Sequence, residues 1–149
     1  MNPSALKSYM IQKNKKVWNT QPERNFLEYS RERRMGLIQN VTLNLQWEGR
    51  PISFQCDFAR PLDWKNYNVT GFHDNALGFD TDFETDGAKF HSSMRQMRKD
   101  HWKDSIKVAS GYKVIHVAGE LTERKWWAYL DEHIPKLLAK PMGAYYIAA

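Results

Sequence analysis

The sequence predicts an α/β (α+β) fold in which a central mixed β-sheet of about four strands is flanked by helices. Three observations predict it: a helical segment comes first, three strand-like segments follow, and helix, strand and helix then alternate. The 149 residues suit a single domain. We expect a basic N-terminal arm at residues 1–20, one domain at 21–140 and a C-terminal tail at 141–149.

A helix and a hairpin are predicted for the first half of the domain. Residues 22–35 have helical composition, with an apolar side that includes Phe26 and Tyr29, and Gly36 follows as a stop signal. Residues 41–47 and 52–57 alternate polar and apolar side chains on either side of the turn residues Glu48-Gly49-Arg50-Pro51, which predicts a β-hairpin. Residues 60–76, rich in Asn and Asp, are expected to form a loop or an insertion.

Strands and helices alternate in the second half. We expect strands at 77–86 and 112–117, a helix at 93–111 and a last helix at about 122–139. A capping box at Ser93 and a terminal Gly111 bound the helix at 93–111. A helical wheel separates its residues into an apolar side (Met94, Met97, Trp102, Ile106, Val108, Ala109) and a charged side expected to face solvent (Lys99, Asp100, Lys103, Asp104, Lys107).

Composition limits the class of protein. Lys and Arg number 22 against 17 acidic residues, so the formal net charge is +5, and 13% of the residues are aromatic. Such a composition suits a polyanionic partner such as nucleic acid. The single cysteine, Cys56, excludes a disulfide framework and a cysteine-based zinc site. The single cysteine also favours a reducing compartment, so we expect a cytoplasmic protein. The mean hydropathy of −0.71 and the lack of a long apolar stretch predict that it has no membrane partner.

A concentration of carboxylates interrupts this basic chain. Residues 74–86 contain five acidic residues and no Lys or Arg. Because side chains alternate along a strand, Asp80, Asp82, Glu84 and Asp86 share one face of the strand at 77–86. Like charges in such positions repel each other. Two explanations remain open: a solvated acidic edge, which we favour for Asp80 and Asp82, or a site for a divalent cation.

Three of the carboxylates are candidates for such a site. Asp57 ends the second strand, and Glu84 and Asp86 point the same way near the end of the third. If the two strands pair, these side chains converge and suit Mg²⁺, with Mn²⁺ as a substitute. His91 follows closely and would activate water or protonate a leaving oxygen.

The same residues resemble a known nuclease family. The segment Phe83-Glu-Thr-Asp-Gly-Ala-Lys-Phe-His91 is similar to the E-x-D-G-x-x-x-H signature of the very-short-patch-repair-like (Vsr-like) branch of the PD-(D/E)XK superfamily. Flanking segments resemble that branch in the same order: Cys56-Asp-Phe-Ala59, Arg98-Lys-Asp-His-Trp-Lys-Asp104 and Gly111-Tyr-Lys-Val-Ile-His-Val117. Glu23 occupies the place of an acidic residue on the family's first helix. The resemblance covers about residues 20–135.

The resemblance implies metal-dependent hydrolysis of DNA phosphodiester bonds by a restriction-endonuclease-like core. Asp57, Glu84 and Asp86 would be catalytic metal ligands, with Asp86 in place of the superfamily's usual lysine. His91 would act near the attacking water, and Glu23 would support a ligand or a bound water. Lys89, Arg98, Lys99 and Lys103 would bind DNA. The single cysteine departs from the zinc site of the mismatch-repair enzymes and puts that biology in doubt.

Several functions remain open. An endodeoxyribonuclease encoded by a phage or mobile element would act either as a site-specific, homing-type nicking enzyme or as a Holliday junction resolvase. Branched DNA would favour a symmetric homodimer. The alternatives are a non-catalytic DNA-binding module with a nuclease-like fold and an interaction protein whose acidic strand is a docking face.

Overall fold

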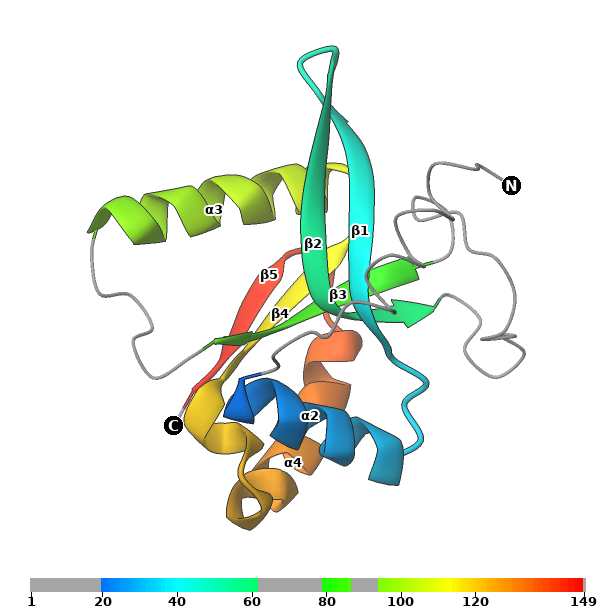
Figure 1. Cartoon of the computed structure of the whole chain (residues 1–149), viewed down its shortest axis with the longest axis vertical. Helices are drawn as coiled ribbons and strands as arrows, with labels where there is room; N and C mark the ends of the chain where they lie inside the picture. Colours follow the sequence, from blue (N-terminus) through cyan, green and yellow to red (C-terminus); the bar gives the residue numbers. More distant parts are fainter. Residues whose placement is uncertain (1–19, 62–78, 87–93, 149) are drawn as a thin grey trace.

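A five-stranded mixed sheet organises the protein, and helices cover both of its faces (Figure 1). The computed structural model describes residues 20–61, 79–86 and 94–148. The strands lie side by side in chain order, β1-β2-β3-β4-β5. The first three pair antiparallel, whereas β3–β4 and β4–β5 pair parallel, each through a helical crossover. The mixed α/β architecture predicted from the sequence is confirmed.

The elements occur in the predicted order, with one addition. The described helices and strands are α2 (Gln21–Glu32), β1 (Ile38–Trp47), β2 (Arg50–Pro61), β3 (Phe79–Asp86), α3 (Met94–Ala109), β4 (Lys113–Ala118), the 3₁₀ helices η1 (Gly119–Thr122) and η2 (Arg124–Trp126), α4 (Trp127–Leu138) and β5 (Ala144–Ile147). Strand β5 lies in the segment expected to be a tail, and it brings the strand count to five.

Local sequence signals explain how α2 and the hairpin form. Thr20 caps α2 by accepting a hydrogen bond from the Glu23 backbone N–H, and a proline occupies the first turn. In the hairpin, Glu48 and Gly49 both have positive φ, as a two-residue type I′ turn requires. Strand β2 is longer than predicted and goes on to pair with β3, with Phe58 opposite Phe83.

The end of α3 is fixed by a glycine motif. Gly111 has φ +95°, and its N–H donates to the Val108 carbonyl, while the Tyr112 N–H donates to the Lys107 carbonyl. These two bonds form the Schellman motif that the glycine predicts. The motif sets where α3 stops and β4 begins, and so positions the last turn of α3 over the sheet.

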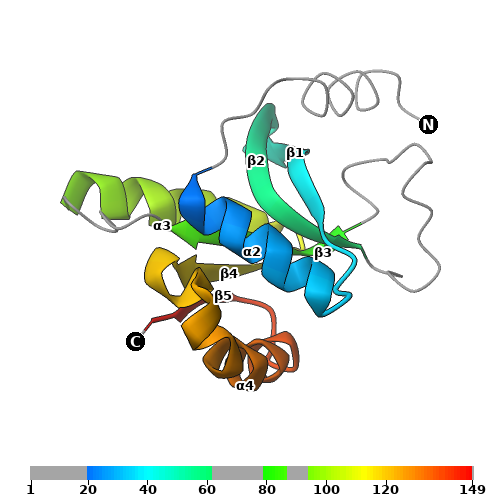
Figure 2. The same ribbon diagram turned by 60° about the horizontal axis from the view of Figure 1, so that its bottom comes forward.

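The helices form two layers. Figures 1 and 2 show α2 and α4 on one side of the sheet and α3 on the other. On the α2/α4 side, buried aromatic and aliphatic side chains from three elements form one core: Phe26 and Tyr29 of α2, Leu130 and Ile134 of α4, and Phe58, Phe83, Ile115 and Val117 of the sheet. A second core lies under the hairpin and includes Ile106 of α3 and Tyr112. No helix in the described parts of the chain is long and apolar enough to cross a membrane.

Candidate functional site

The acidic face of β3 turns toward α3, and each of its four carboxylates has a basic partner from the chain itself. Arg60 pairs with Asp80 at 3.1 Å. Lys107 pairs with Asp82 at 2.6 Å and with Glu84 at 3.1 Å, and His116 pairs with Asp86 at 3.0 Å. Asp82 is fully buried, so the expected solvated face is wrong for this residue.

Lys107 lies inside the molecule. Only 4% of it is exposed, although the helical wheel placed it on the solvent side of α3. Burial alone would lower the pKa of Lys107, but the negative charges of Asp82 and Glu84 outweigh it and raise that pKa. The ammonium group is therefore charged. The expectation was wrong because the sheet face beneath α3 is itself charged, and a helix covering it needs cations rather than apolar side chains.

Asp57 and Glu84 lie next to each other where β2 and β3 separate. Asp57 comes directly before Phe58, the first residue of β2 that pairs with β3, and it accepts a hydrogen bond from the Thr85 backbone N–H at 3.0 Å. Burial raises the pKa of Asp57, and hydrogen bonds with Glu84 and Thr85 partly oppose this. Burial also raises the pKa of Glu84 well above its usual range, and the charges of Asp82 and Asp57 add to the effect.

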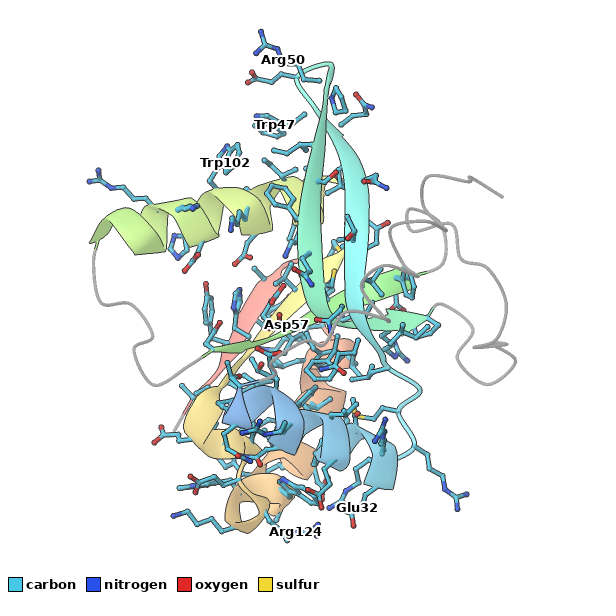
Figure 3. The ribbon with its side chains drawn as sticks, in the orientation of Figure 1. Glu32, Trp47, Arg50, Asp57, Trp102 and Arg124 are labelled. Carbon is cyan, nitrogen blue, oxygen red and sulfur yellow. The ribbon has the colours of Figure 1, made fainter. Side chains whose placement is uncertain are left out.

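Glu23 joins this group from the first turn of α2. Its pKa is raised by burial and by the negative charge of Asp57. Figure 3 shows Asp57 at the end of the sheet that faces α2. The structure therefore brings Glu23, Asp57, Asp82 and Glu84 into one cluster, in which Lys107 forms ion pairs with Asp82 and Glu84.

A second ionic cluster surrounds His116 of β4. The Nδ1 atom of His116 contacts Asp86 at 3.0 Å and the Nε2 atom contacts Asp104 of α3 at 2.8 Å. The ring of Tyr146 from β5 stacks on the imidazole, with the two centroids 4.5 Å apart. Burial opposes protonation, but the hydrogen bonds and charges of the two carboxylates raise the pKa of His116 to about 9. The imidazolium ties β3, β4 and α3 together.

The two clusters meet in one pocket of about 200 Å³. From the two clusters, Glu84, Asp86, Asp104, Lys107 and His116 line it. Phe54 and Gln55 of the hairpin and Asp100 and Lys103 of α3 line the remainder. The pocket thus lies between the hairpin, α3 and the sheet. It combines several carboxylates with Lys103, whose ammonium group is able to contact an anion.

The donor set of the Glu84 cluster fits a divalent cation. Within the described residues no three His, Cys, Asp or Glu side chains already have an arrangement that would hold a metal ion. Mg²⁺, however, is held by one or two carboxylates completed by water and substrate phosphate. The buried Oδ1 atom of Asp82 accepts no hydrogen bond. Burial, and after it the negative charge of Asp82, raises the pKa values of Asp57 and Glu84, and a bound cation would offset both effects.

The other predicted site residues are distributed differently. Asp86 is bonded to His116 rather than aimed at Asp57 and Glu84. Lys103 lines the pocket, and Arg98 and Lys99 are exposed on α3. His91 and Lys89 lie outside the described residues, as do the capping box at Ser93 and most of the expected loop at 60–76.

Four participating residues were not predicted to belong to the site: Asp82, Asp104, Lys107 and His116. Two sequence signals pointed to three of them. After Lys113, His116 is the one polar residue of strand β4, and Asp104 and Lys107 lie one helical turn apart on α3. Neither signal indicates which partner the side chain meets.

Comparison of the chain with known protein families, with characterised proteins and with solved structures found no match.

Proposed function

We propose that the protein is a divalent-metal-dependent endodeoxyribonuclease of the Vsr-like PD-(D/E)XK type, which hydrolyses DNA phosphodiester bonds. The observation that carries the proposal is the contact between the Asp57 and Glu84 carboxyl groups at the end of the β2–β3 ladder, where burial raises the pKa of both and the negative charge of Asp82 adds to the effect. A nuclease also accounts for the pocket that Glu84 lines and for the cationic side chains along α3.

Each described residue has a defined part in this proposal. Asp57 and Glu84 would hold the cation, with Mg²⁺ or Mn²⁺ as the ion, and Glu23 would orient a bound water or a ligand from α2. The cation would polarise a phosphoryl oxygen and lower the pKa of a bound water. Lys107 keeps Asp82 paired, and Lys103 lies where it can contact a phosphate of the substrate. His116 fixes the orientation of Asp86.

One observation favours a different function. Lys107 forms an ion pair with one oxygen of the Glu84 carboxylate, Oε1, and this oxygen is then less available to a metal ion. A nuclease fold that keeps this ion pair permanently would bind DNA without cutting it. This DNA-binding module is the second candidate.

The two candidates differ in a cleavage assay. Supercoiled plasmid and a four-way junction are each incubated with the protein in Mg²⁺, in Mn²⁺ and in EDTA. We expect metal-dependent cleavage that Glu84→Gln abolishes, because glutamine preserves the shape but lacks the charge that holds the cation. The matched control is Glu132→Gln, on the exposed face of α4, which should cleave at the wild-type rate.

The outcomes separate the proposals. Binding without cleavage in either metal would support the DNA-binding module. Cleavage that survives Glu84→Gln would remove the assigned site. Faster cleavage of the junction than of the plasmid would favour a junction resolvase over a site-specific nicking enzyme of a phage or mobile element, and a dimer in solution would agree with it.

A further inference from the structure

A tryptophan stands at the rim of the pocket without being part of the core. Trp102 of α3 is 43% exposed and lies edge-to-face with Phe54 of the hairpin, with ring centroids 6.0 Å apart. Phe54 lines the pocket, and so does Lys103, the residue that follows Trp102. Figure 3 shows Trp102 between α3 and the hairpin, with Trp47 and Arg50 further along the hairpin toward its tip.

The exposure of Trp102 is not explained by packing. In the described parts of the chain, three large apolar or aromatic side chains are exposed: Trp102, Met142 and Tyr146. Tyr146 is accounted for by its stacking on His116. Trp102 has charged neighbours in α3, Lys103 among them, and a large part of its indole ring is in contact with water. Because burial of apolar surface is favourable, an exposed indole suggests a binding partner.

The surroundings of Trp102 combine an aromatic ring with positive charge. Arg98 and Lys99 lie one turn earlier on α3 and are exposed, and Arg50 is exposed at the hairpin tip. Proteins that bind single-stranded nucleic acid use the same combination, because cations follow the phosphates and aromatic rings stack on the bases. In a duplex each base face is already covered by its neighbours, so a rim tryptophan of this kind suits an unpaired base.

Phe54 connects Trp102 to the pocket. The centroid of the Phe54 ring lies 6.0 Å from the centroid of the Trp102 ring and 5.8 Å from the Nζ atom of Lys107. Phe54 lines the pocket together with Glu84 and Lys107. A base stacked on Trp102 would therefore lie next to the pocket in which a phosphodiester would meet Glu84 and Lys107.

We propose that Trp102 stacks on an unpaired base and that the substrate class is DNA with a junction between duplex and single strand. This inference rests on the proposed nuclease function for its DNA partner. It selects branched or flapped DNA over a fully paired site as the preferred ligand.

Binding in EDTA tests the inference without any cleavage. A fluorescently labelled duplex and the same duplex extended by an unpaired tail are titrated with wild type, Trp102→Ala and Trp102→Phe. We expect the tailed DNA to bind wild type more tightly, and Trp102→Ala to weaken that binding by about five- to a hundredfold, as loss of one base stack does. Binding of the duplex should change less than twofold, and Trp102→Phe should retain most of the preference.

The controls keep this test separate from the nuclease test. Met142→Ala removes another exposed apolar side chain and should leave both affinities unchanged. Equal weakening of tailed and paired DNA by Trp102→Ala, or no weakening, would overturn the inference even if the protein cleaves DNA. A Trp102-dependent preference in a protein that cleaves nothing would support the inference and leave the nuclease proposal refuted.

Discussion

At the scale of single residues, buried charges decide how the sheet and α3 fit together. Lys107 and Asp82 form an ion pair from which water is excluded, with the Lys107 Nζ also near the Phe54 ring. Burying both ions carries a desolvation cost close to the attraction between them, so the pair adds little net stability. Removing one partner is different, because the other charge remains buried and uncompensated.

A double-mutant cycle measures this effect. We expect Lys107→Met to lower the free energy of unfolding by about 3 kcal/mol, since Asp82 and Glu84 lose their counter-charge. Adding Asp82→Asn should restore part of the loss, so that the double variant is more stable than the sum of the single changes predicts. Urea denaturation gives the values. Simple additivity of the two changes would show that the ion pair has no energetic role.

His116 predicts how stability depends on pH. Its pKa rises from 6.5 to about 9 in the folded protein, which corresponds to about 3 kcal/mol of stabilisation. Because the folded state binds the proton more tightly, this contribution is fully present below pH 6.5 and is lost as the pH rises through 9. The stability difference between wild type and His116→Gln should therefore shrink between pH 6 and pH 9.5.

Thermal unfolding at several pH values checks this prediction. His101→Gln is the matched control, because His101 is exposed on α3 and its replacement removes no buried ion pair. A difference between wild type and His116→Gln that stays constant over this pH range would show that the imidazole is not held in its charged form.

At the scale of the elements, a close approach between α2 and the sheet brings Glu23 to the site. A Cβ on Gly119 would lie 2.5 Å from the Asp86 carbonyl oxygen and 3.0 Å from Pro22 Cγ. No L-residue with a side chain fits there unless α2 or the end of β3 moves. The absence of a side chain at position 119 thus lets the start of α2 pack against the strand that carries Glu84 and Asp86.

Gly119→Ala tests this packing. We expect a loss of about 2 kcal/mol in unfolding free energy, because the obstructing atom belongs to the backbone and has little freedom to move. Gly143→Ala is the control, since its Cβ would meet the Tyr145 ring at 3.3 Å and this side chain can shift. Comparable losses in the two variants, measured in urea, would contradict the close approach.

At the scale of the whole molecule, the carboxylate cluster around Asp57 and Glu84 is expected to link cation binding to the stability of the fold. A ligand that binds only the folded state stabilises it by mass action. We expect 10 mM Mg²⁺ to raise the melting temperature of wild type by about 3 °C, if the dissociation constant is about 1 mM. The shift should grow with pH, because the cation displaces protons from carboxyl groups with raised pKa values.

Differential scanning fluorimetry at constant ionic strength measures this shift. Glu84→Gln should show no response to Mg²⁺, whereas Glu132→Gln should respond like wild type. An equal response in Glu84→Gln would place the cation elsewhere. The assay contains no DNA, so its result is independent of cleavage.

Local sequence patterns were sufficient to predict much of this architecture. The period-2 alternation and the Glu48-Gly49 turn predicted the hairpin, Gly111 predicted the end of α3, and the spacing of Phe26 and Tyr29 predicted the buried side of α2. Alternation also placed the carboxylates of β3 on one face, as the structure has them. These features depend on residues close together in the chain, so the sequence by itself determined them.

Only the tertiary structure decided which groups face the carboxylates. In the sequence, Lys107 and Asp104 have the pattern of a solvent-exposed helix face, but in the structure they contact charged side chains of the sheet that α3 covers. Strand β5 pairs with β4, a contact that its own short sequence does not indicate. The distances that pair Lys107 with Glu84, and His116 with Asp86, join residues 23 and 30 positions apart. Such pairings depend on how the layers pack, and a periodic pattern carries no information about the charge of the surface that a helix will cover.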